Sequence, residues 1–271
     1  MTAERYIEQL TLSKVNYPKR SRASTPYPTM ATRTLGLGTA DSLSPSPAPP
    51  AAIPANLQAA VNVGSLLSFV EGVSAQEKDD ILFSVQFAQR GASGAFNRYT
   101  QVQSWYQKYT DILEQLGWAT EQLAFTQLDQ SEGNLRMDKA ALAIITAIAT
   151  QNQLAVLTQA VKALESMAEA DNAIQLFDFH TATQTSGNFQ IGAVQKAPND
   201  ALALALGAFH FHNADARRKF LFFAWGERNV SFWTAAQKMT LNTTHYAPHR
   251  DTVRRKLGLA AAEFIEALPL G

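Results

Sequence analysis

Apolar runs separated by short polar breaks dominate the stretch from Ile174 to Leu241. The breaks, such as Gln184–Asn188 and Lys196–Asp200, are too short to contain a crossover helix. We therefore expect an antiparallel meander of strands, covered on at least one face by helices from upstream in the chain. The predicted strands cover residues 174–181, 188–195, 201–212, 219–225 and 231–241.

Helical spacing of apolar residues marks most of the remaining chain. The capping-box pattern Ser74–Glu77 opens one helix, which Gly91 and Gly94 are expected to break. Asp138 is expected to cap the most apolar helix, and Gln151–Gln153 to separate it from the next. Residues 118–128 are expected to form a further strand. The predicted helices cover residues 56–70, 74–90, 97–116, 138–149, 154–167, 243–257 and 260–268.

These elements predict one α/β (α+β) domain over residues 56–271, with a mostly antiparallel sheet packed by several helices in a complex topology. Residues 1–55 differ in composition, and segment 41–54 contains five prolines. We expect this region to be a flexible, basic, Pro/Ser-rich extension whose deletion leaves the core intact.

Composition excludes several classes of function. The 271-residue chain has no cysteine, which excludes disulfides, thiolate zinc sites and cysteine nucleophiles. Lys plus Arg equals Asp plus Glu at 23 each, so there is no overall basic field for nucleic acid. We expect no transmembrane segment and no signal peptide, hence synthesis in the cytoplasm, with release or a peripheral membrane position both open.

Two arrangements of polar residues were considered for chemistry. His210, His212, His245 and His249 form two closely spaced pairs, but no motif joins them, and we expect no metal and no cofactor. Asp178 and His180 alternate onto one face of a predicted strand, without a nucleophile beside them. An unrecognised hydrolase using this pair stays an alternative to a non-enzymatic protein.

Contact with an anionic membrane rests on basic residues near the start of the chain, because clustered cations are attracted to anionic lipid. A disordered tail with no membrane role, or an organelle transit sequence, is the alternative for these residues. The helical pair over 138–168 is expected to pack in the core rather than to insert into a bilayer. The candidate residues for electrostatic contact are Lys14, Lys19, Arg20, Arg22 and Arg33, with Arg250, Arg254 and Arg255 near the other end of the chain.

Short motifs across residues 56–268 resemble the Erwinia virulence factor (Evf) family. They are Leu116–Trp118, Met137–Ala140, Gly187–Gly192, Ala205–Phe209 and Met239–Asn242. The resemblance implies a single α/β domain of complex topology without catalysis, and a palmitoyl group attached to a cysteine near position 194. Ala193 and Val194 occupy that place here, so the lipid anchor is not carried over.

The resemblance implies a non-enzymatic virulence or host-interaction factor that associates peripherally with lipid surfaces but lacks a palmitoyl anchor. Anionic lipid or a free fatty acid is the expected partner, and Phe189, Ile191 and Val194 are the candidates for lining an acyl pocket. A structural or self-assembling protein, including a homo-oligomer, is the alternative from a different class.

Overall fold

A computed structural model of the 271-residue chain describes residues 2–13, 57–120, 123–128, 135–183, 185–213, 219–222, 224–225, 230–258, 261–268 and 270. Its centre is a mixed eight-stranded sheet with the strand order β10-β1-β2-β6-β7-β9-β3, in which β4 also pairs with β9. Three long strands, β6 (Ser186–Lys196), β7 (Leu202–Asn213) and β9 (Val230–Leu241), form the predicted antiparallel meander. The α/β fold class and the mostly antiparallel sheet are confirmed, and only β2 and β6 pair in parallel among the described strands.

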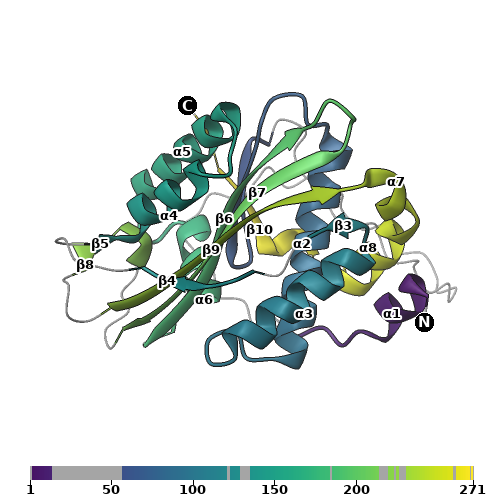
Figure 1. Ribbon diagram of the computed structural model, residues 1–271, viewed down its shortest axis with the longest axis horizontal. Coiled ribbons are helices and arrows are strands. Elements are labelled where there is room, and N and C mark those ends of the chain that lie inside the picture. The colour runs from purple at the N-terminus through teal and green to yellow at the C-terminus, as the bar shows by residue number, and fades with distance from the viewer. Residues whose placement is uncertain are drawn as a thin grey trace, which may run out of the picture.

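Helices cover both faces of the sheet (Figure 1). On one face lie α2 (Ala75–Ala95), α3 (Val102–Gln115) and α8 (Arg250–Leu257), and on the other lie α4 (Met137–Thr146), α5 (Gln151–Ser166) and α6 (Asn172–Thr181). Because the long strands are buried on both faces, each buries two sets of side chains. On β6, Phe189 and Ile191 face α4–α6, whereas Val194 faces the α2–α3 layer.

Residues 57–70 form a hairpin of β1 (Ala59–Asn62) and β2 (Ser65–Phe69), not the predicted helix. Every residue of both strands is buried. A strand buried on both faces lacks the regular apolar–polar alternation that marks a half-buried strand, so it is easily mistaken for helix. Val63 takes a positive φ of 54° at the tight turn between the two strands.

The predicted strand over 174–181 is instead the helix α6, capped by the Asp171 side chain, which accepts from the Ala173 N–H. Its buried residues include Ile174, Phe177 and Thr181, which lie three and four residues apart. The prediction was wrong because the polar residues Asp178 and His180 happen to alternate with apolar ones. As a result these two side chains, two apart on a helix, do not share a face.

Several boundaries also differ. Residues 219–225 form a short 3-10 turn, Phe220–Phe222, and the two-residue β8, Ala224–Trp225, which pairs with β5, Leu135–Arg136. Residues 261–267 form another 3-10 turn, Ala261–Phe264, and the edge strand β10, Ile265–Ala267. Within the described residues of 118–128, the expected strand is present only as β3, Trp118–Ala119, and β4, Thr126–Gln127.

Helix ends were predicted with mixed success. The Ser74–Glu77 capping box is present, and Gly117 and Gly258 take positive φ after α3 and α8. Asp138 does not cap α4: its carboxylate accepts from the guanidinium of Arg136, the N-cap residue, at 3.0 and 2.9 Å. Gln151–Gln153 is the first turn of α5, because Thr150 and Gln153 form a second capping box.

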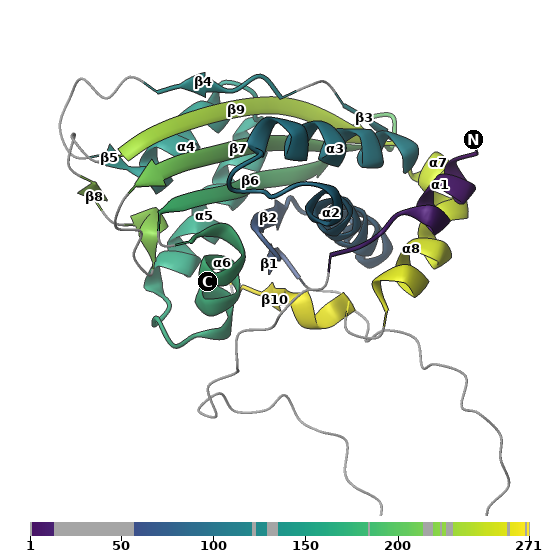
Figure 2. The ribbon, with the colours of Figure 1, turned by 90° about the horizontal axis from the view of Figure 1, so that it is seen from below.

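The start of the chain packs on the core. Helix α1 (Ala3–Gln9) lies beside α8, where Figure 2 shows it in purple. Ile7 is 0% exposed within the core cluster. Lys256 of α8 donates to the carbonyl oxygens of Ile7, Glu8 and Leu10 at 3.1, 2.6 and 2.7 Å. The flexible extension predicted for residues 1–55 therefore does not begin at residue 1, and residues 14–56 lie outside the described residues.

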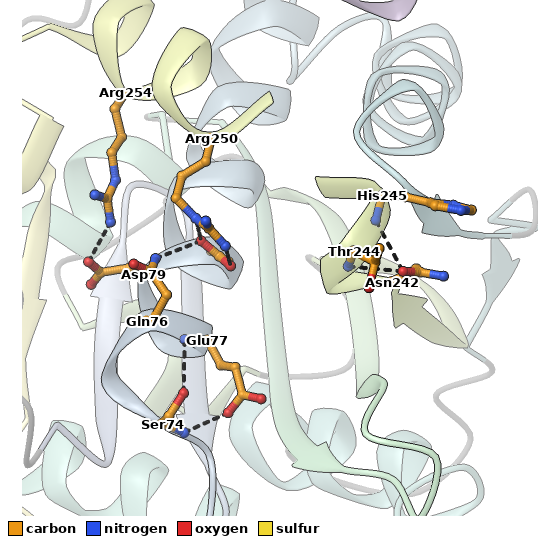
Figure 3. A network of polar contacts seen from close by, with 10 residues as sticks. Ser74, Gln76, Glu77, Asp79, Asn242, Thr244, His245, Arg250 and Arg254 are labelled. Atoms are coloured by element: carbon orange, nitrogen blue, oxygen red, sulfur yellow. Dashed lines mark hydrogen bonds and ion pairs between the residues drawn. The ribbon is translucent and has the colours of Figure 1, made fainter. Parts of the chain in front are cut away.

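Helix α8 is fixed to α2 by two ion pairs. Nε and Nη2 of Arg250 each donate to one oxygen of the Asp80 carboxylate at 2.7 Å. Nη2 of Arg254 donates to the Asp79 carboxylate at 2.7 Å. Figure 3 shows the two arginines reaching from α8 toward α2, above the Ser74–Glu77 capping box. Asp80 is 1% exposed, so its pair belongs to the class of buried ion pairs whose loss of one partner is strongly destabilising.

The first prediction concerns α1. We expect Ile7→Ala to lower the free energy of unfolding by about 2–4 kcal/mol, because it removes a buried aliphatic side chain from a packed site. Chemical denaturation of the full chain measures the change. Arg5→Ala, at an exposed position of the same helix, serves as a control and is expected to change stability by less than about 0.5 kcal/mol. Equal stability of both variants would mean that α1 does not contribute to the core.

Candidate functional site

The three residues predicted to line an acyl pocket lie inside the packed core. Phe189 stacks on Phe209 with ring centroids 5.0 Å apart, and both belong to the cluster under α4–α6. Ile191 belongs to the same cluster, whereas Val194 belongs to the cluster on the opposite face of the sheet. The strand therefore brings Phe189 and Ile191 together and separates both from Val194.

The basic residues predicted to contact a membrane do not form one exposed patch in the described part of the chain. Arg250 and Arg254 pair with the α2 carboxylates, and Arg255 pairs with Glu8 of α1. These arginines hold α8 to its neighbours. Lys14, Lys19, Arg20, Arg22 and Arg33 lie outside the described residues.

The two histidine pairs lie at opposite ends of the long strands. His212 of β7 pairs with Ser231 at the start of β9, whereas His245 follows Leu241 at the end of β9. The ten residue steps from Ser231 to Leu241 separate the two histidine pairs by roughly 30 Å, since a strand rises about 3.3 Å per residue. No group of three or more potential metal-ligating side chains is found among the described residues.

An open cleft of about 300 Å³ lies at the turn between β1 and β2. There the end of α2 and the connection to α3, on one face of the sheet, meet the end of α6 from the other face. Among the described residues, its wall carries two arginines, one histidine and several amide and hydroxyl groups, but no carboxylate. The lining residues are Ser13, Val63, Gln89, Arg90, Ser93, Phe96, Asn97, Arg98, Tyr99, Phe179 and His180.

Arg98 is held in the cleft wall by the turn that joins α2 to α3. Asn97 forms this turn, because its side-chain oxygen accepts from the N–H groups of Tyr99 and Thr100 at 2.9 and 3.2 Å. The Arg98 guanidinium donates to the Asn188 carbonyl at 3.0 Å and lies over the Trp105 ring, with Cζ 4.8 Å from the ring centroid. Arg98 is 7% exposed, and its buried Nε has no hydrogen-bond partner in the described part of the chain.

Glycine at position 64 makes this placement possible. A Cβ atom there would lie 2.5 Å from Nη2 of Arg98. The β1–β2 turn therefore approaches the guanidinium more closely than any larger residue would allow, and it exposes backbone rather than a side chain to the charge.

Arg90 supplies the second positive charge, from the last turns of α2. Its Nη1 donates to the Leu257 carbonyl at 3.2 Å and its Nη2 to the Ser13 carbonyl at 3.4 Å. The Nε atom is buried without a partner among the described residues, and burial lowers the pKa of the guanidinium. Neither Arg90 nor Arg98 pairs with a carboxylate in the described part of the chain.

A buried polar network supports Arg98 from beneath. The Asn188 side chain donates to the Arg98 carbonyl at 2.7 Å and accepts from the Tyr106 hydroxyl at 2.6 Å. Gln89 accepts from the Gly64 N–H at 3.1 Å and donates to Ser65 at 3.1 Å. These contacts fix the turn and the strand on which Arg98 rests, so the positive charge is held in place before any ligand arrives.

His180 faces the same charge. Burial, and then the positive charge of Arg98, lower its pKa to about 3, and its buried Nε2 has no partner among the described residues. The ring is therefore neutral at physiological pH. The neighbouring Phe179 is 45% exposed. The other large apolar side chains whose burial is described are at least partly buried.

The electrostatics and shape of the cleft favour an anion that carries an apolar group. Two guanidinium groups without carboxylate partners attract negative charge, and they hold their full charge at every physiological pH. Phe96, Phe179 and Val63 add apolar surface to the same cleft. A cavity of this size falls at the lower end of the range for small-molecule sites.

Of these residues only His180 was singled out from the sequence, as the partner of Asp178 in a hydrolase pair, and the others were not identified. The available signal was the occurrence of Gln89–Arg90 and Arg98–Tyr99 at the end of a largely apolar helix. The residues that line the cleft have no fixed spacing along the sequence, because β1–β2, α2–α3 and α6 meet only in the folded protein.

Comparisons with known proteins give weak results. No protein-family model matches the sequence, and no curated protein matches it significantly. A delta-endotoxin structure is 11% identical with a TM-score of 0.42, covering 75% of this chain and 91% of that one. Activated Cyt2Ba from Bacillus thuringiensis subsp. israelensis is 11% identical with a TM-score of 0.40, covering 66% and 97%.

The Evf virulence factor structure is also 11% identical, with a TM-score of 0.33, covering 77% of this chain and 84% of that one. The structural similarity to toxin and virulence-factor folds is thus real but weak, and family membership is not established.

The second prediction concerns His180. We expect its ring to remain neutral from pH 8 to pH 5, because burial and Arg98 both oppose protonation. An NMR titration of the histidine ring protons tests this, with the urea-unfolded protein as the control that titrates near about pH 6.5. Between pH 6.5 and about 3 the unfolded chain binds the extra proton, so this group makes stability fall as pH falls. A His180 midpoint near 6.5 in the folded protein would contradict the prediction.

Proposed function

We propose that the protein is a non-enzymatic binding protein for an amphiphilic anion, held by Arg98 and Arg90 in the cleft beside the β1–β2 turn. The ligand is either a free fatty acid or the head group of an anionic lipid, which share a negative group attached to an apolar chain. Binding at a bilayer would give a peripheral association with the lipid surface that needs no acyl anchor. The observation that carries the proposal is the buried Arg98, which lines the cleft and has no carboxylate partner among the described residues.

Burying the positive charge of Arg98 costs free energy. An ionised group taken out of water is unfavourable unless it is paired or hydrogen-bonded. Arg98 has one carbonyl acceptor and a stacking contact with Trp105, while its Nε has no partner among the described residues. An anionic ligand in the cleft would supply the negative charge that Arg98 lacks, through a charge-assisted hydrogen bond of the strong kind.

Phe179 supports the amphiphilic part of the proposal. It projects from the end of α6 at the cleft and is exposed, whereas the large apolar side chains elsewhere in the described residues are at least partly buried. An exposed aromatic ring beside a positive pocket matches a ligand whose charged end enters the pocket and whose apolar end lies over the ring. The same arrangement would let the ring enter the outer layer of a bilayer.

The cleft also favours binding over catalysis. A general base works best when its pKa is near the working pH, and a pKa of about 3 makes His180 poorly suited. The Ser93 hydroxyl accepts from the indole N–H of Trp105 at 2.9 Å. Asp178 accepts from the Lys219 N–H at 2.8 Å on another face of α6, which separates it from His180.

Membrane insertion of a helix is not part of the proposal. None of the helices in the described ranges combines the length and apolar character needed to cross a bilayer. The α4–α5 pair packs its buried residues, including Ile145 and Leu157, against the sheet.

The third prediction tests the charge. We expect the wild-type protein to bind dodecanoate but not dodecanol, and Arg98→Gln to weaken dodecanoate binding about 10- to 100-fold, because hydrogen bonds to charged groups contribute about 1.5–3 kcal/mol. Isothermal titration calorimetry gives the affinities. Lys162→Gln removes one positive charge from an exposed site on α5 and is the matched control. Equal affinity for dodecanoate and dodecanol would contradict the proposal.

The same proteins distinguish the two sources of ligand. Co-sedimentation with phosphatidylglycerol vesicles, compared with phosphatidylcholine vesicles, tests the lipid head group. Binding to dodecanoate alone identifies a fatty-acid carrier, whereas binding to anionic vesicles that Arg98→Gln abolishes identifies a surface-associated protein. Circular dichroism confirms that each variant is folded.

The fourth prediction tests the apolar part. Phe179→Ser changes an exposed side chain, so we expect unchanged stability but about a 5- to 20-fold loss of dodecanoate affinity, based on the area of a partly buried aromatic ring. Binding of acetate, measured by competition, is expected to stay unchanged. A loss of acetate binding in this variant would show that Phe179 shapes the charged pocket instead of contacting the chain.

A further inference from the structure

The segment that follows α1 reaches the cleft that the proposed function assigns to an anion. After α1 ends, residues Leu10–Ser13 run along α2 toward Arg90. The Ser13 N–H donates to the Arg90 carbonyl at 3.0 Å, and the Ser13 carbonyl accepts from Arg90 Nη2 at 3.4 Å. Ser13 itself lines the cleft. One nitrogen of the cleft's second guanidinium is therefore occupied by the chain's own backbone.

The close approach of this segment explains two glycines inside a helix. A Cβ at Gly94 would lie 2.3 Å from the Thr11 carbonyl oxygen, and a Cβ at Gly91 would lie 2.5 Å from the Leu10 side chain. Glycine in a helix interior costs about 1 kcal/mol relative to alanine. The helix nevertheless continues through both positions, and the absent side chains leave room for residues 10–13.

The contacts along the segment are unequal. Helix α1 is anchored by buried Ile7 and by the three carbonyl contacts of Lys256. Beyond it, Thr11 is exposed, Leu12 and Ser13 are only partly buried, and a second cleft of about 360 Å³ remains between the segment and α2. Residues 11–13 are therefore held to the core less firmly than α1.

We propose that residues 11–13 form a latch that competes with the anionic ligand for Arg90, an inference that rests on the proposed function of the cleft. An anion bound between the two arginines takes the Nη2 donor from the Ser13 carbonyl and opens the latch. Opening of the latch in turn frees Arg90 and strengthens anion binding. By linkage, the two effects are equal in free energy.

Gly94→Ala is the sharpest test of the latch. The new methyl group meets the Thr11 carbonyl and displaces the latch, while alanine strengthens the helix, so the core is not weakened. Ser13→Pro opens the latch by another route, because proline lacks the N–H that the Arg90 carbonyl accepts. Thr11→Ala is the matched control, since it alters an exposed side chain and leaves the backbone contact with Gly94 unchanged.

We expect Gly94→Ala and Ser13→Pro, in the full chain, to bind dodecanoate at least about fivefold more tightly than the wild type, a typical size for coupling between sites. Thr11→Ala should bind like the wild type. In the wild type, dodecanoate should speed hydrogen exchange of the Ser13 amide, measured by mass spectrometry, by a similar factor. Unchanged or weaker affinity in both latch variants, or slower exchange with ligand, would overturn the latch.

The outcomes separate the latch from the proposed function. Equal binding by the wild type and both latch variants removes the latch but keeps the binding site. Absence of dodecanoate binding in all four proteins removes the proposed function and, with it, the latch as a regulator of that site.

Discussion

The burial of the long strands on both faces is the constraint on which the rest of the structure depends. Phe189 and Phe209 pack under α4–α6, while Val194 and Leu204 of the same two strands pack under the α2–α3 layer. Neither helical layer alone would cover this sheet. The chain therefore has to cross from one face to the other, and the ends of α2 and α6 meet beyond the β1–β2 turn. The cleft is formed where these two layers come together past the end of the β1–β2 hairpin.

The polar residues of the sheet are the exception to this packing, and they lie beneath the cleft. Asn188 and Gln190 are fully buried on the face toward α2 and α3, where an apolar residue would pack without needing partners. Their partners include Tyr106, Ser65 and the backbone of Arg98. A buried polar network costs stability unless its members are satisfied. Two of the buried side-chain atoms without a hydrogen-bond partner among the described residues, Gln190 Nε2 and Arg98 Nε, belong to this network and its charged end.

The sequence was sufficient for elements whose burial leaves a regular pattern. The meander of β6, β7 and β9 and the amphipathic α3 were found because turns or polar faces interrupt their apolar positions. The hairpin over 57–70 was missed because burial on both faces removes alternation, and α6 was missed because Asp178 and His180 imitate it. Gly91 and Gly94 were interpreted as a helix end, since only the fold shows that residues 10–13 lie against them. The cleft could not be predicted, because its residues come from four separate segments and only the tertiary structure brings them together.

The pairing of arginines separates structural charges from the candidate site. Arg136 contacts Asp138 and Glu165, Arg250 contacts Asp80, and Arg254 contacts Asp79, so each of these charges is neutralised where it holds two elements together. Arg98 is more deeply buried than any of the three, yet its contacts are a carbonyl oxygen and an aromatic ring. The fold places a carboxylate within ion-pair distance of each of the other three arginines, and it could have placed one beside Arg98 as well. The lining of the cleft instead leaves that charge facing an open volume, an arrangement that is costly for a structural role and suited to an anionic ligand.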